Sequence, residues 1–377
     1  MESTVPGEPT LPALTIEQLC GQLVVAGYGG PFPSDALVRA HRDGALGGFI
    51  VFKRNLVADA APDEVVDALS DSLARLAEVS VTDLPPLLAI DQEGGRVARL
   101  GAPVLGLPSM RALAAKGDVD LVRRAGKALG EELRAIGLTM DFAPILDVDS
   151  NPKNPIIGDR AFATSPAEAA RFALAFAAGL AEGGLLACGK HFPGHGDTEA
   201  DSHLELPVVR KNRAALEATE LVPFRLAARA RVPAFMSAHV LYPELDEAPA
   251  TLARSISHDL LRGEIAFTGV LISDDLEMRA LSQDVEITSV SAVRAGCDIL
   301  LVCENEALVF RARQALVAEA SRDPAFRSRC EEALARGLAM RRSCPPRPAS
   351  KLERDALFAA HAPLREELAR PVSKELP

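Results

Sequence analysis

The sequence predicts a (β/α)₈ barrel, on three observations. Eight short apolar runs recur along the chain, a helix-like segment follows each run, and the alternation continues over roughly 300 residues, the size of such a barrel. Unbroken apolar runs, rather than alternating ones, indicate parallel strands that are buried on both faces. A doubly wound open sheet is the alternative, but it rarely contains eight evenly spaced strands. The runs lie at 23–27, 48–52, 86–91, 138–144, 184–191, 233–239, 269–274 and 298–302.

The segments between these runs have the pattern of amphipathic helices, clearest at 62–79, 120–137 and 165–184. In the last of these, Ser165 and Pro166 are typical of a helix start and Gly183-Gly184 of a helix end. A helical tail follows the eighth run, at 305–320, 323–342 and 350–370, and the sequence CPPRP at 344–348 interrupts it. We therefore expect a catalytic barrel over residues 1–343 and a C-terminal helical extension over residues 344–377.

Composition excludes several classes of function. A formal net charge of −11 argues against nucleic acid and anionic membranes as partners, because both require a basic surface. Trp is absent and Tyr occurs only at Tyr28 and Tyr242, so exposed aromatic platforms for sugar chains are not expected. The six cysteines form no CxxC pair, which fits a reducing compartment. With no signal-peptide pattern and no membrane-length apolar stretch, we expect a cytoplasmic protein.

Polar residues fall at the ends of five predicted strands. They are Asp91, Asp141, the pair Lys190-His191, His239 and Asp274. Active sites of such barrels lie at the carboxyl ends of the strands, so these side chains should converge on one mouth. One charged residue at a strand end is usually an ordinary surface residue, but five together are hard to attribute to chance.

The segment KHFPGHGDTEADSHLELP, residues 190–207, holds three of the seven histidines. Three interpretations remain open: a metal site, a solvated polar loop, or a pair in which Asp201 orients His203. An extended backbone places residues i and i+2 on the same side, so Asp201 and His203 can touch.

Three further segments carry candidate residues. In GVLISDDLEM, 269–278, Asp274 and Asp275 should point to opposite faces of a strand, so that only one enters the mouth; alternatively, the pair caps a helix beginning near Leu276. AIDQEGGRVARL, 89–100, could bind sugar hydroxyls or a phosphate, although it lacks the glycine spacing of known phosphate-binding loops. In NPIIGDRAF, 154–162, Arg160 follows the fourth strand; taken by itself, a loop arginine is usually a surface charge.

Together these segments resemble the bacterial β-N-acetylhexosaminidases of glycoside hydrolase family 3, the peptidoglycan-recycling, single-domain type. The matching segments are the four above and MSAHVLYPELDEAPATLARSI, in the family's order from about residue 20 to 305, and KHFPGHG followed by DSH is the most specific. The resemblance implies a TIM barrel, Asp274 as nucleophile, and His203 as acid/base paired with Asp201. It also implies that the terminal sugar is bound by Asp91, Arg99, Arg160, Lys190 and His191.

The implied chemistry is retaining hydrolysis of terminal non-reducing N-acetylglucosamine, through a glycosyl-enzyme on Asp274. His203 can protonate an alkoxide and deprotonate water near neutral pH. We expect no metal and no organic cofactor, a small carbohydrate such as an N-acetylglucosaminyl-anhydromuropeptide as substrate, and a monomer or weak oligomer. Two alternatives remain: a phosphorylase that releases the sugar 1-phosphate, and a catalytically silent sugar-binding barrel.

Overall fold

The computed structural model, which describes residues 12–81, 83–199, 205–281 and 283–371, is a closed barrel of eight parallel strands. Each strand pairs with the next in sequence, and the first pairs with the last. The predicted TIM barrel is therefore confirmed, and every strand overlaps one of the expected apolar runs. The strands are β1 Val24–Ala26, β2 Gly48–Val51, β3 Leu87–Ile90, β4 Met140–Asp141, β5 Leu186–Phe192, β6 Ala234–Ser237, β7 Val270–Asp275 and β8 Ile299–Val302.

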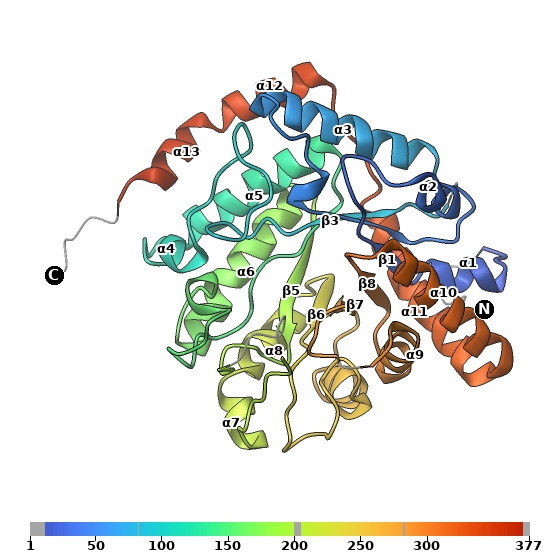
Figure 1. Ribbon diagram of the computed structural model, residues 1–377. Coiled ribbons are helices and arrows are strands. Elements are labelled where there is room, and N and C mark those ends of the chain that lie inside the picture. Colours follow the sequence, from blue (N-terminus) through green and yellow to red (C-terminus); the bar gives the residue numbers. More distant parts are fainter. Residues whose placement is uncertain (1–11, 82, 200–204, 282, 372–377) are drawn as a thin grey trace, which may run out of the picture.

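Helices surround the barrel (Figure 1). The tail segment predicted as one helix over 350–370 is two helices, because Pro363 lies in the first turn of the second and cannot continue the first. The helices of the described residues are α1 Ile16–Gly21, α2 Asp35–Arg42, α3 Pro62–Glu78, α4 Met110–Ala114, α5 Val119–Ile136, α6 Pro166–Glu182, α7 Arg213–Ala218, α8 Leu221–Arg229, α9 Val285–Ala295, α10 Glu306–Arg322, α11 Pro324–Ser343, α12 Lys351–Ala360 and α13 Ala362–Ala369, with a π-helix at Ser255–Glu264 and 3₁₀ turns at Lys53–Asn55 and Gly158–Arg160.

The barrel interior is filled by apolar side chains, and the end of α11 closes it from below. Met340 and Cys344 pack against the interior cluster of strand residues. The thiol of Cys344 donates to the carbonyls of Thr139 and Gly184, just before β4 and β5, at 3.4 and 3.2 Å. Nη1 of the buried Arg341 donates to the carbonyl of Gly47, just before β2, at 2.8 Å. This floor leaves the carboxyl ends of the strands as the end of the barrel at which a site can form.

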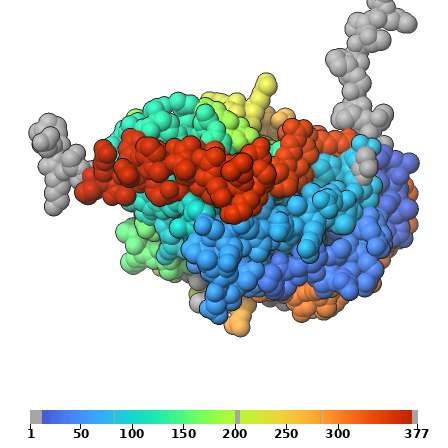
Figure 2. Space-filling model, turned by 90° about the horizontal axis from the view of Figure 1, so that it is seen from above, coloured from blue at the N-terminus to red at the C-terminus, as the bar shows by residue number. Residues whose placement is uncertain are grey.

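The C-terminal helices α12 and α13 form a band across the outer helices of the barrel (Figure 2). Phe358 is buried, Arg354 donates to Asp67 of α3 at 2.6 Å, and His361 lies 2.8 Å from the buried carboxylate of Glu132 in α5. These contacts support the division that we propose, a barrel over residues 1–343 with an extension docked on its helical layer. Among the described residues, no helix combines the length and the apolar character that crossing a membrane requires.

Candidate active site

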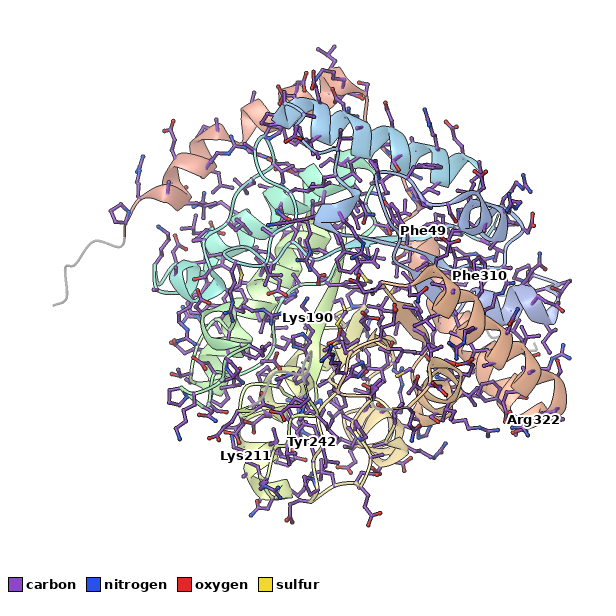
Figure 3. All side chains as sticks on the ribbon, viewed as in Figure 1. Phe49, Lys190, Lys211, Tyr242, Phe310 and Arg322 are labelled. Atoms are coloured by element: carbon purple, nitrogen blue, oxygen red, sulfur yellow. The ribbon has the colours of Figure 1, made fainter. Side chains whose placement is uncertain are left out.

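A cavity of about 490 Å³ opens at the carboxyl ends of the strands. Its apolar lining includes Phe142, Met236 and Leu301, which also belong to the barrel interior. Lys190, at the end of β5, lies near the centre of the molecule in the view of Figure 3. The cavity is lined by six of the eight residues that the sequence singled out for the site, namely Asp91, Arg99, Arg160, Lys190, His191 and Asp274.

A network of five charged side chains forms the polar wall of this cavity. Lys190 Nζ lies 2.7 Å from Asp91 Oδ1 and 2.7 Å from Glu93 Oε1. Arg99 donates to Asp91 Oδ2 at 2.9 Å, and Arg160 donates to both oxygens of Glu93 at 2.9 and 2.8 Å. Burial raises the pKa of Asp91 and Glu93, but the neighbouring cations outweigh it and hold both pKa values below their ordinary range. Both carboxylates are therefore ionised, and the wall presents fixed charged donors and acceptors.

Glu93 is a residue that the sequence analysis missed. Its side chain is only 1% exposed, and it neutralises two cations that lie 67 and 97 residues away. In the sequence it is one acidic residue beside two glycines, with no local sign of its partners. A lysine at the end of an apolar strand does require counter-ions, since a buried unpaired charge is costly. That argument predicts a carboxylate near Lys190, but it does not say which one.

Asp147, which the sequence analysis also missed, fixes two histidines of the cavity. Its carboxylate is fully buried; Oδ2 lies 2.7 Å from Nδ1 of His191, and Oδ1 accepts from the backbone N–H of His195 at 2.7 Å. Burial raises the pKa of Asp147, but the histidines hold it below its ordinary value. Burial lowers the pKa of His195 to about 4, so this ring is neutral at neutral pH. Asp147 therefore sets the orientation of the His191 ring, which lines the cavity.

Both Asp274 and Asp275 line the cavity, so the expectation that only one of them would reach the mouth is wrong. Between β7 and β8 the register pairs Ile272 with Ile299 but Asp275 with Leu301, so β7 carries one extra residue there, a β-bulge. Nor do the two residues cap a helix near Leu276, since α9 begins at Val285.

The pKa values of the two neighbouring carboxyl groups are shifted in opposite directions. Burial raises the pKa of Asp274, yet His239, His191, the backbone N–H of Asp275 and Lys190 hold it below its ordinary value. Burial raises the pKa of Asp275 to about 7. Asp274 is thus ionised at neutral pH, as a nucleophile must be, whereas Asp275 is still partly protonated there.

Two of the six strand-end residues do not line the cavity. Asp141 is fully buried and is not part of the cavity lining; its Oδ1 accepts from the backbone N–H of Gln92 at 2.9 Å, and burial raises its pKa to about 8. His239 is also buried and is not part of the cavity lining. The remaining candidates, Asp201 and His203, lie outside the described residues, so their proposed roles stay predictions.

Comparison with known proteins gives the family. The sequence model of the family 'Glycosyl hydrolase family 3 N terminal domain' matches residues 15–336. A beta-hexosaminidase of Neisseria meningitidis is 39% identical over 285 residues, 72% of this chain and 75% of that protein.

Two solved structures share the fold. A family 3 beta-N-acetylglucosaminidase of Paenibacillus sp. str. FPU-7 has a TM-score of 0.81 at 39% identity; the match covers 88% of this chain and 63% of that one. NagZ of Neisseria gonorrhoeae in complex with N-trifluoroacetyl-D-glucosamine has a TM-score of 0.70 at 33% identity, and the match covers 84% and 98%. With a family match over most of its length and with the charged cavity at the mouth of its barrel, the chain belongs to glycoside hydrolase family 3.

Proposed function

We propose that this glycoside hydrolase is a β-N-acetylhexosaminidase that removes terminal non-reducing N-acetylglucosamine with retention of configuration. The observation that carries the proposal is the pairing, in one cavity, of an ionised Asp274 with a preformed wall of charged hydrogen-bonding groups. The wall suits a sugar ring rich in hydroxyls, and the carboxylate suits attack on its anomeric carbon.

The nonreducing sugar would be bound by Asp91, Arg99, Arg160, Lys190 and His191. The first four are locked in the ionic network together with Glu93, so that little side-chain freedom is lost on binding. The similarity to a Neisseria gonorrhoeae protein that binds a glucosamine derivative supports this assignment.

His203 would serve as the acid/base, oriented by Asp201. It protonates the leaving oxygen while Asp274 forms the glycosyl-enzyme, and it then removes a proton from the water that releases the sugar. This reaction needs no metal and no organic cofactor.

We further propose fragments of peptidoglycan turnover as the natural substrate, on the sequence resemblance described above, and a cytoplasmic location. The location is supported by the cysteines, all six of which are buried free thiols, as expected in a reducing compartment. A monomer or a weak oligomer is the expected state.

The decisive experiment compares good and poor leaving groups in His203→Ala. On a natural disaccharide the variant should lose about 10²–10⁴-fold in turnover, the usual span of general acid catalysis. On a dinitrophenyl N-acetylglucosaminide, the first step needs no proton and should be nearly unimpaired. The second step should become slow, so a burst of dinitrophenolate should appear, and azide should speed turnover and yield a β-glycosyl azide. Asp201→Ala should show a weaker form of the same pattern.

Equal losses on both substrates, without burst or azide product, would make His203 a binding residue. The same assays with and without inorganic phosphate test the phosphorylase alternative, because formation of the sugar 1-phosphate would contradict hydrolysis. A wild-type protein that binds N-acetylglucosamine without any turnover would instead be the silent barrel.

A further inference from the structure

His239 is a buried histidine to which the proposed mechanism gives no sugar-binding and no proton-transfer role. It lies two residues beyond β6, and its Nε2 is 2.9 Å from the backbone carbonyl oxygen of Asp275 on β7. A carbonyl oxygen only accepts hydrogen bonds, so Nε2 must carry a hydrogen and donate it. The contact therefore joins the end of β6 to the bulge of β7.

The other ring nitrogen is held by a hydroxyl network. His239 Nδ1 lies 2.8 Å from Thr251 Oγ1, which in turn lies 2.8 Å from Ser237 Oγ and 3.1 Å from the carbonyl of Ala238. A hydroxyl donates to a neutral imidazole and accepts from a protonated one. Thr251 can thus hold the ring in the same orientation in either state.

The residue that His239 contacts is fixed from several directions. The backbone N–H of Asp275 donates to Oδ1 of Asp274 at 2.8 Å. Oδ1 of Asp275 accepts from the backbone N–H groups of Glu277 and Cys303 at 3.1 and 3.2 Å. The carbonyl of Asp275 is the acceptor for His239. Asp275, whose backbone N–H binds one oxygen of the proposed nucleophile, is therefore held at its own carbonyl by an imidazole that follows the neighbouring strand β6.

We propose that His239 is a positioning residue, which holds the β7 bulge through the Asp275 carbonyl and thereby aims the Asp274 carboxylate at the anomeric carbon. The inference rests on the proposed role of Asp274. It goes beyond that role because it names a side chain that the reaction requires and that does not line the cavity. The proposed sugar-binding residues lie after β3, in β5 and at Arg160, and none lies on β7. Loss of this contact should therefore slow the attack and leave sugar binding intact.

Replacing His239 with Gln or with Asn distinguishes this positioning role from simple packing. In His239→Gln the amide nitrogen reaches about as far as Nε2 and can still donate to Asp275. In His239→Asn it reaches only about as far as Nδ1. On a dinitrophenyl N-acetylglucosaminide, which needs no acid catalyst, formation of the glycosyl-enzyme should fall about 10²-fold in the Asn variant, a loss that a displacement of about 1 Å can produce. The Gln variant should retain most of the rate, and both should bind N-acetylglucosamine in calorimetry as the wild type does.

Thr251 supplies a second pair of variants, which serves if a His239 variant does not fold. Thr251→Ser keeps the hydroxyl that holds Nδ1, whereas Thr251→Val removes it, so only the Val variant should slow glycosyl-enzyme formation. Circular dichroism and urea midpoints show which variants are folded.

Equal rates in the two members of each pair, or a loss of binding as large as the loss of rate, would overturn the positioning role. Asp274→Asn separates this failure from failure of the proposed function. If Asp274→Asn keeps its turnover, the nucleophile assignment is wrong whatever the His239 variants do. If Asp274→Asn is inactive while His239→Gln and His239→Asn behave alike, only the positioning role is wrong.

Discussion

Removing the charge of Glu93 should destabilise the whole barrel. Glu93→Gln keeps the size of the side chain, but one of the oxygens that face Arg160 and Lys190 becomes an amide N–H₂, which cannot accept. The three contacts concerned are 2.7 to 2.9 Å long and almost fully buried. Breaking a buried ion pair from one side costs about 3–5 kcal/mol. Because Asp91 still neutralises Lys190, we expect the lower end, about 3 kcal/mol.

The pH dependence follows from the direction of the pKa shift of Glu93. Burial raises this pKa, but Arg160 and Lys190 outweigh burial, so it is lower in the folded protein than in the unfolded chain. A carboxyl of this kind stabilises the fold above its unfolded pKa of about 4.3, and loses that contribution as the pH falls through the folded value. The difference between wild type and Glu93→Gln should therefore be constant from about pH 6 to 8 and should shrink below about pH 4.

Urea unfolding followed by circular dichroism measures this difference, since the chain has no Trp for fluorescence. Glu182→Gln is the matched control, because Glu182 pairs with Arg123 at the same distance of 2.7 Å, but with 42% and 43% of the side chains exposed. An exposed pair contributes about 1 kcal/mol or less. A midpoint shift in Glu93→Gln no larger than in Glu182→Gln would refute the claim that the buried network holds the site together.

Three further predictions concern single residues. Asp274→Asn should lose roughly 10³-fold or more in turnover of an aryl glycoside, because the covalent step has no substitute. Asp275→Asn should be far milder, since an amide oxygen can still accept the two backbone N–H groups; the reverse order would exchange their roles. Lys190→Ala should lower kcat/KM about tenfold or more, as a charged hydrogen bond contributes about 1.5–3 kcal/mol; unchanged efficiency in a folded variant would remove it from the site. Burial raises the pKa of Asp141 to about 8, so ionisation costs stability as the pH rises from the unfolded value of about 4. Asp141→Asn should therefore gain stability relative to the wild type between about pH 5 and 8 in urea unfolding, and a difference independent of pH would contradict this.

The strands could be predicted because their signal is local. A strand buried on both faces must be apolar throughout, so each run is visible without knowledge of its neighbours. Asp91, Lys190 and Asp274 could be found for a related reason, because parallel strands of a barrel all bring their carboxyl ends to one mouth.

Other parts of the site depend on distant partners and could not be predicted. Glu93 and Asp147 matter because of cations and imidazoles that lie tens of residues away along the chain. Asp275 reaches the cavity at a bulge that is defined by the pairing of β7 with β8. Asp141 shows the opposite error: its position in the sheet was predicted correctly, but its side chain is buried and does not line the cavity.

The closed floor of the barrel has a consequence for how substrate and product exchange. Met340, Arg341 and Cys344 close the lower end of the barrel interior, so in the described part of the chain the cavity is sealed on that side. A glycan cannot pass through the barrel, and a sugar cleaved in the cavity should leave through the mouth by which the next substrate enters. Released monosaccharide should therefore compete directly with incoming substrate.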